Sequence, residues 1–122
     1  FTYSEPIIQG KLNIQQEWFD FVIDAMVEVN KVGTASRVFG NSPFPVAGKT
    51  GTAQVFTIKQ DEEYDSEKVP ERLKDHSLYI GFAPVDKPRI AIAVVVENGG
   101  FGVTTATPIA KLVFDFYLAK KR

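Results

Sequence analysis

The chain has 122 residues, 44% hydrophobic and 24% charged, which is the size and composition of one ordinary globular unit or part of one. Fourteen Lys and Arg against fifteen Asp and Glu leave a net charge of -1, so no chain-wide positive field attracts nucleic acid or an anionic membrane. The chain has no cysteine, which excludes disulfides and thiolate metal sites but fits a reducing and an oxidising compartment equally well. Its longest apolar run, 90–96, is far shorter than the ~20 residues of a transmembrane helix. We predict no nucleic-acid partner, no metal and no other cofactor.

The first predicted element is a helix that Asn13 caps, with Gln16 completing a capping box, and that Gly33 ends. Its other positions form an apolar face so broad that we expect it to pack against a sheet or several partners, with Trp18 and Phe19 in the core. The polar residues recur at steps of three and four along one stripe: Glu17, Asp20, Asp24, Glu28 and Lys31.

A short second helix is predicted over 34–39, with Thr34 as its cap and Gly40 at its end. Two prolines then favour an extended chain that leads into a predicted strand over 46–56. The two glycines of that strand, Gly48 and Gly51, are costly inside a strand unless something must approach the backbone closely.

A helical turn is predicted near 70–74. Two further strands are predicted after it, over 77–83 and 89–97, and they are joined as an antiparallel hairpin. With the strand before them they make a sheet of at least three strands. A C-terminal helix begins at Thr107-Pro108. Four apolar residues lie on one side of it: Ile109, Leu112, Val113 and Phe116. The predicted fold class is α+β, an antiparallel sheet packed with helices.

The sequence Lys49-Thr50-Gly51-Thr52 lies in the first predicted strand and carries the chemistry of interest. It offers a cation, two hydroxyls and, at Gly51, an approachable backbone, which suits the binding of a carboxylate beside a carbonyl under attack. Alternation along a strand puts Thr50 and Thr52 on one face, so Lys49 has to reach around from the other. The tripeptide alone is weak, because Lys-Thr-Gly has a chance occurrence of ~1–3% in a chain of this length.

Lys-Thr-Gly is one of three motifs shared by β-lactamases and penicillin-binding proteins, together with Ser-x-x-Lys and Ser-Asp-Asn. No serine here is followed by Lys at the third position, and no Ser-x-Asn triplet occurs. The chain therefore lacks a Lys-activated nucleophile, which excludes a self-contained serine acyl enzyme.

The segment 44–56, FPVAGKTGTAQVF, closely resembles the third-motif strand of the penicillin-binding protein 2 family, the elongation-type class B penicillin-binding proteins. Further segments resemble that family in the same order: 33–35, 71–76, 80–84 and 93–100. The resemblance spans roughly 5–118, which no chance tripeptide produces. It implies that residues 1–122 are the C-terminal portion of a transpeptidase domain, half of a β-lactamase-like fold, without the nucleophile-bearing portion.

The resemblance implies a peptidoglycan D,D-transpeptidase that cross-links stem peptides through a serine acyl-enzyme and is acylated by β-lactams. Lys49 would set the electrostatics and proton transfer around the missing second-motif Ser, while the Thr50 and Thr52 hydroxyls would bind the substrate carboxylate. The Thr52 backbone N–H would be one oxyanion donor, worth ~3 kcal/mol of transition-state stabilisation. Gly51 would keep the strand open to the ligand.

Implied partners are the stem peptide, β-lactams, the rest of the transpeptidase domain, and cell-wall elongation proteins such as a glycosyltransferase. The chain opens on Phe1 without Met or a leader, so we expect it to be cut from a longer protein. That protein would stand at the periplasmic face of the bacterial inner membrane on an upstream transmembrane helix. Two alternatives stay open: a non-catalytic β-lactam-sensing or partner-binding module of the same fold, and an incidental motif in an unrelated domain.

Other chemistry-bearing residues have plainer interpretations. His76, the only histidine, could carry protons or bind a metal, but without a spaced partner it is best interpreted as a hydrogen-bonded structural residue at a strand start. The acidic run 61–63 could be half of a cation site, yet it is better interpreted as a solvated loop. Tyr64 and Phe101 could border the cleft, although exposed loop aromatics also occur without function.

Overall fold

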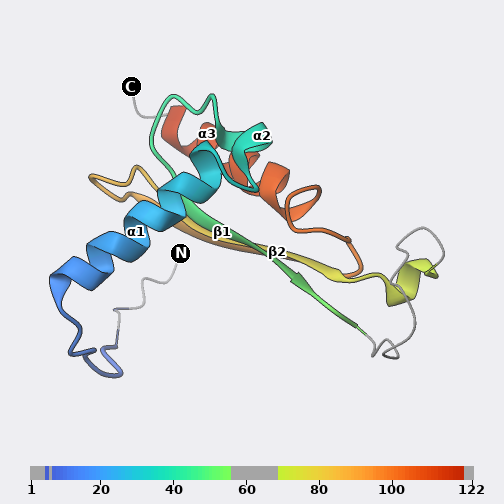
Figure 1. The fold of residues 1–122 in the computed structure, drawn as a ribbon, viewed down its shortest axis with the longest axis horizontal. Helices are drawn as coiled ribbons and strands as arrows, with labels where there is room; N and C mark the ends of the chain where they lie inside the picture. The colour runs from blue at the N-terminus through green and yellow to red at the C-terminus, as the bar shows by residue number, and fades with distance from the viewer. Residues whose placement is uncertain (1–4, 6, 56–68, 120–122) are drawn as a thin grey trace.

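The structure is a computed structural model that describes residues 5, 7–55 and 69–119, and it contains one antiparallel sheet with helices packed on it (Figure 1). The strands pair in the order β1-β2-β3. Helices and strands follow one another along the chain as α1 (Gln16–Lys31), α2 (Ser36–Phe39), β1 (Ala47–Ala53), the 3-10 turn η1 (Glu71–Leu73), β2 (His76–Ala83), β3 (Ile90–Val96) and α3 (Ala106–Ala119). The predicted α+β class and the hairpin of the last two strands are confirmed.

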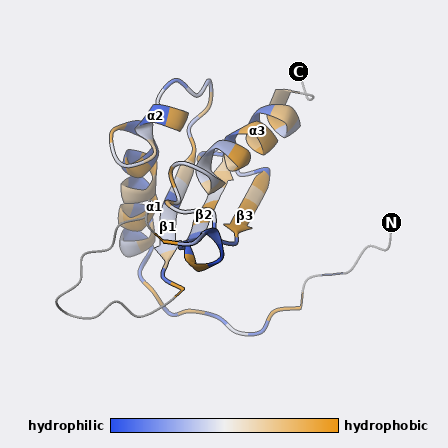
Figure 2. Ribbon diagram, turned by 90° about the vertical axis from the view of Figure 1, so that its right-hand side faces the viewer, coloured by the Kyte–Doolittle hydropathy of each residue, from blue (hydrophilic) through white to orange (hydrophobic). Residues whose placement is uncertain are grey.

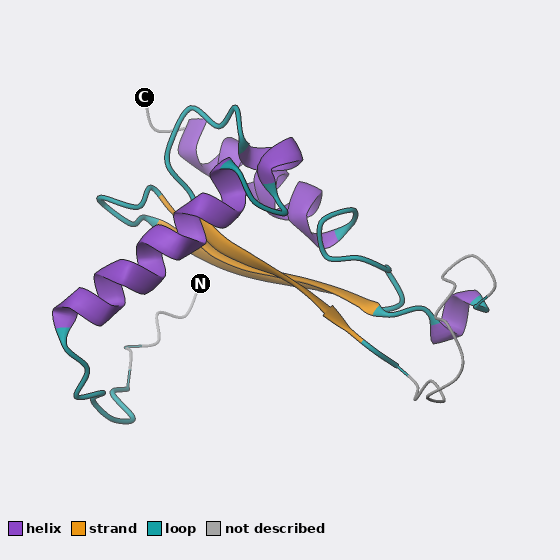
Figure 3. Ribbon diagram, in the orientation of Figure 1, coloured by secondary structure: helices purple, strands orange, loops and turns teal. Residues whose placement is uncertain are grey.

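One face of the sheet is covered by α1, α2 and α3, which lie on the same side of the strands in Figure 3. Thr50, Tyr79 and Val94 stand opposite one another on the three strands and share this face. The Tyr79 ring stacks on Phe39 with centroids 5.5 Å apart, and Phe39 meets Phe114 edge-on at 6.1 Å. Burial of these rings forms the core of the described chain.

The other face carries Lys49, Ile80 and Ala93 opposite one another, and the described residues leave it uncovered. Ile80 is 54% exposed and Val95 on the same face is 65% exposed. β3 is apolar along its whole length, as Figure 2 shows, although only one of its faces is packed by helices. An exposed apolar sheet face of this kind marks a surface to which another part of a protein binds.

Helix α1 packs against β1 only through its C-terminal half, because its N-terminal half extends past the sheet (Figure 1). Trp18 and Phe19 are therefore 58% and 41% exposed, and the prediction that they belong to the core was wrong. The helix ends at Lys31, and the Gly33 N–H donates to the Glu28 carbonyl at 2.8 Å, as the position of that glycine predicted.

Both predicted N-caps were wrong. Helix α1 begins at Gln16 with Gln15 as its cap and no side-chain capping bond, so Asn13 lies outside the helix. Leu12 and Ile14 are largely exposed, and no hydrophobic staple fixes an earlier first turn. Helix α2 begins two residues after Thr34, because the turn that closes α1 continues through that residue.

Helix α3 begins at Ala106 and presents its smaller residues to the sheet. The residues that it buries are Ala106, Thr107, Ala110 and Phe114. The apolar side that the sequence singled out is exposed instead, with Leu112 and Phe116 at 70% and 63%. Small side chains let the helix approach the sheet closely. No helix of the described part is both long and apolar enough to span a lipid bilayer.

Candidate active site

Strand β1 carries the predicted site residues and is an edge strand of the described sheet. Lys49 is exposed on the uncovered face, opposite Ile80. Its Nζ donates to the carbonyl oxygen of Thr50 at 2.8 Å, so the side chain folds back along its own strand. The alternation expected from the sequence is present, and the ammonium lies at the strand edge.

The hydroxyls of the motif lie on the opposite side of β1. Thr50 is half-buried opposite Tyr79, and Thr52 is exposed opposite Ser77. The Thr52 Oγ1 accepts a hydrogen bond from the Gly102 N–H at 3.3 Å. A hydroxyl that already accepts such a bond keeps its own proton for donation. Thr52 is thus arranged to donate to an anionic ligand at this edge.

The backbone of β1 is approached closely at Gly51, but the approaching group is Gly102. A Cβ at Gly102 would lie 2.6 Å from the Leu78 carbonyl oxygen and closer still to that of Gly51, so only glycine fits there. A Cβ at Gly51 would meet the Leu78 Cβ at 3.2 Å, which is tight but tolerable. The loop after β3 therefore rests directly on the site strand.

A buried hydrogen-bond network that the sequence analysis missed holds this loop in place. Ser77 Oγ donates to the Phe101 carbonyl and accepts from the Ala106 N–H, both at 3.0 Å. Thr107 Oγ1 donates to the Gly102 carbonyl at 2.8 Å, and both hydroxyl residues are fully buried. No local pattern could have revealed the two bonds of Ser77, because they join residues 24 and 29 positions apart in the sequence.

His76 lies half-buried at the start of β2, where its Nδ1 accepts from the Asn98 N–H at 2.9 Å. The Asn98 side chain in turn donates to the carbonyls of Arg72 and Lys74, at 3.0 and 2.9 Å. The backbone of Asn98 has a positive φ of 56°. Asparagine tolerates this left-handed conformation better than most residues. The predicted hydrogen bond of His76 at the start of a strand is present, and its structural role stays a prediction.

Phe101 is 53% exposed on the loop that contacts Thr52 through Gly102, so it borders the strand edge. The acidic run 61–63 and Tyr64 lie outside the described residues. In the described part, no three His, Asp or Glu side chains gather in a way that could hold a metal ion.

Tyr79, at the centre of the covered face, donates from its hydroxyl to Asn30 Oδ1 at 3.2 Å. Burial raises the pKa of this phenol from 10.0 to about 12.

Among the described serines, none forms a hydrogen bond with a lysine: Ser77 bonds to backbone, and the buried Ser42 Oγ has no partner. The described residues thus offer a cation and hydroxyl donors at this strand edge, and none of the described serines has a lysine partner to activate it.

Known proteins resemble this chain over most of its length. Residues 2–115 match the penicillin binding protein transpeptidase domain family. The peptidoglycan D,D-transpeptidase MrdA of Acinetobacter baumannii is 44% identical over 115 residues, which are 93% of this chain and 17% of that protein.

Two solved structures are similar over most of the chain. Pseudomonas aeruginosa PBP2 in complex with WCK 5153 has a TM-score of 0.71 and 34% identity, covering 99% of this chain and 24% of that one. The Helicobacter pylori PBP2 complex with MreC has a TM-score of 0.69 and 26% identity, covering 89% and 19%.

The chain thus spans less than a fifth of its curated relative and about a quarter of the first solved structure. The family match nevertheless runs through the three strands of the described part and through 106–115 of α3. This chain belongs to the penicillin-binding protein transpeptidase domain family, as a segment similar to D,D-transpeptidases of the MrdA, or PBP2, type.

Proposed function

We propose that this chain is the C-terminal portion of the transpeptidase domain of a peptidoglycan D,D-transpeptidase, and that β1 is its Lys-Thr-Gly strand. The observation that carries the proposal is the position of Lys49, exposed at a sheet edge on the one face that the described chain leaves uncovered. That face is apolar, with Ile80 and Val95 more than half exposed. The portion of the domain that carries the nucleophilic serine covers it.

In the assembled site, Lys49 stabilises charge and guides proton transfer near the serine of the second motif. Its present partner, the Thr50 carbonyl, is a neutral acceptor, so the ammonium is easily redirected to a better one. Thr50 and Thr52 bind the carboxylate of the stem peptide or of a β-lactam, and Gly51 leaves their strand accessible. The Thr52 backbone N–H is one of the two donors that stabilise the oxyanion of the tetrahedral intermediate.

The serine acyl-enzyme is formed by loss of the terminal D-amino acid and is resolved by the amine of a second stem peptide, which forms the cross-link. The parent protein is anchored by an upstream transmembrane helix at the periplasmic face of the inner membrane. The relative from Helicobacter pylori was solved with MreC, which supports a proposed place among cell-wall elongation proteins, such as a glycosyltransferase.

The test measures the second-order rate of acylation by a fluorescent penicillin in the full-length parent protein and in its Lys49→Ala variant. We expect the parent to form a stoichiometric adduct and Lys49→Ala to acylate at least ~100-fold more slowly with its fold retained. Lys49→Arg should recover only part of the rate, because a planar fork replaces a compact charge. Acylation of Lys49→Ala within threefold of the parent would make Lys49 a structural residue.

The 122-residue chain by itself is the matched negative control. It carries no Lys-activated serine, so we expect no penicillin adduct by mass spectrometry. An adduct on any of its residues would contradict the assignment of the nucleophile to the rest of the domain. A parent that is acylated but transfers the acyl group to no amine acceptor would instead be a β-lactam-sensing module.

A further inference from the structure

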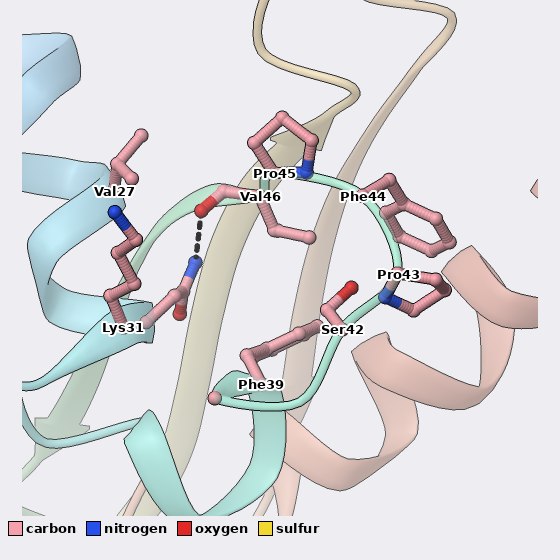
Figure 4. A pocket seen from close by; sticks show the side chains of 10 residues that line it. Val27, Lys31, Phe39, Ser42, Pro43, Phe44, Pro45 and Val46 are labelled. Carbon is pink, nitrogen blue, oxygen red and sulfur yellow. Dashed lines mark hydrogen bonds between the residues drawn. The ribbon is translucent and has the colours of Figure 1, made fainter.

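Asn30 joins three elements of the fold through one buried amide. It lies in the last turn of α1 and is 3% exposed. Its Nδ2 donates to the carbonyl of Val46 at 2.8 Å, directly before β1 begins, and Figure 4 draws this bond as a dashed line. Its Oδ1 accepts from the Tyr79 hydroxyl at 3.2 Å. Helix α1, the start of β1 and the middle of β2 therefore share one hydrogen-bonded junction.

Tyr79 reaches this junction only because two glycines leave room for its side chain. Gly48 and Gly81 are paired across β1 and β2. A Cβ at Gly48 would lie 2.6 Å from the Tyr79 Cζ and closer still to its hydroxyl oxygen, while a Cβ at Gly81 would lie 3.0 Å from that oxygen. The Tyr79 side chain is thus held against the backbone of Gly48, the residue that precedes Lys49.

The start of β1 has space to move when the junction is lost. A cavity of about 280 Å³ lies beside the Asn30–Val46 bond, lined in part by Phe39, Phe44 and Val46 (Figure 4). As an edge strand of the described sheet, β1 also has a strand neighbour on one side only among the residues that the structure describes. Val46 and Ala47 are buried at this end of β1, and the two side-chain hydrogen bonds of Asn30 add a directional constraint to that packing.

We propose that Asn30 and Tyr79 are positioning residues that set the place of Lys49 in the active site. The proposal rests on the proposed function of the Lys49 strand. The junction fixes the backbone at Val46 and holds the Tyr79 ring against Gly48, so its loss lets the next residue, Lys49, shift. A displacement of about 1 Å at a reacting group is enough to cost up to ~100-fold in rate, even when the substituted residue is remote from the chemistry.

The test uses the full-length parent protein and the rate of acylation by a fluorescent penicillin. Tyr79→Phe keeps the ring on Phe39 and removes only the hydroxyl, and we expect acylation to fall roughly 10-fold. The matched control is Phe114→Leu, which weakens the same core but touches neither hydrogen bond of Asn30. We expect it to acylate within twofold of the parent at a temperature where both variants are folded.

A double substitution separates positioning from general loosening of the domain. If the junction acts through the Lys49 ammonium, Tyr79→Phe should slow acylation no further once Lys49→Ala is present. Asn30→Asp is the second variant. It keeps an acceptor for the tyrosine and loses the donor to Val46, so it should also slow acylation roughly 10-fold.

The proposal would be overturned if Tyr79→Phe and Asn30→Asp were acylated at the parental rate. It would also be overturned if Tyr79→Phe slowed acylation by the same factor in the Lys49→Ala background as in the parent. An unsubstituted parent that forms no adduct would overturn the proposed function, and with it this inference. A parent that is acylated, with variants equal to it, would overturn the inference alone.

Discussion

The two faces of the sheet differ in what stabilises them. On the covered face, Tyr79, Phe39 and Phe114 pack on one another, and the buried polar groups of Asn30 and Ser77 have hydrogen-bond partners. On the uncovered face, the alternate residues of the same strands are mostly apolar, and Ile80 and Val95 are more than half exposed in the described chain.

The difference shows how one strand can take part in the core and also present the side chains of the proposed chemistry. Because side chains alternate, Thr50 stands opposite Tyr79 on the side of the core, and Lys49 stands one residue away on the open side. The core fixes the backbone of β1, and the fixed backbone holds the ammonium at the edge where the rest of the domain is expected.

The largest expected effect is the loss of packing on the covered face. Phe114→Ala removes a fully buried ring and should lower the free energy of unfolding of the transpeptidase domain by about 3–5 kcal/mol. Ile80→Ala is the corresponding substitution on the uncovered face. If the rest of the domain covers Ile80, this change should cost about 2 kcal/mol or more in the parent protein. Urea titration measures both, and a cost for Ile80→Ala below about 0.5 kcal/mol would show that its face stays in water.

The next effect concerns the hydroxyls of Thr50 and Thr52 in the parent protein. A hydrogen bond to a charged group is worth ~1.5–3 kcal/mol, so Thr→Val at either position should slow acylation roughly 10- to 150-fold. Valine keeps the shape and branching of threonine, so stability should hardly change.

The carboxylate assignment is checked by comparing a β-lactam that bears its carboxylate with an analogue in which that group is neutral. The Val variants should lose reactivity toward the acid and little toward the neutral analogue. Equal losses toward both compounds would assign the two hydroxyls to the general architecture of the site.

The smallest effect is a pH dependence that belongs to the covered face. The pKa of Tyr79 is raised from 10.0 to about 12 in the folded chain, so the folded state holds this proton more tightly than the unfolded state. The resulting stabilisation is complete below pH 10 and is lost as the pH rises toward 12, by about 1.4 kcal/mol at pH 11. Unfolding at pH 9 and pH 11 should show this loss in the parent protein and not in Tyr79→Phe. The same loss in Tyr79→Phe would assign it to another group.

The sequence predicted what depends on short-range pattern. The alternation of Lys49 against Thr50 and Thr52, and the hairpin of β2 and β3, follow from a period of two and a short polar turn. The site strand was predicted longer than it is, because its length depends on its pairing with β2.

What the sequence could not predict depends on contacts between distant residues. Trp18 was assigned to the core because its helix is apolar, but whether a face is buried depends on where the helix crosses the sheet. For the same reason no pattern linked Ser77 to Ala106, Gly102 to Thr52 or Tyr79 to Asn30. The groups that carry the proposed chemistry were readable in the sequence, whereas the groups that hold them were not.

The order of strands in the sheet also has a consequence for how the domain folds. The β2–β3 hairpin closes over the short connection 84–89, whereas pairing of β1 with β2 closes the longer connection 54–75. Because closure entropy grows with the logarithm of loop length, the second pairing costs about 1 kcal/mol more than the first. The hairpin is therefore the favoured template, and the strand that bears Lys49 is added to it afterwards. On this estimate the strand proposed to carry the site joins a hairpin that has already formed.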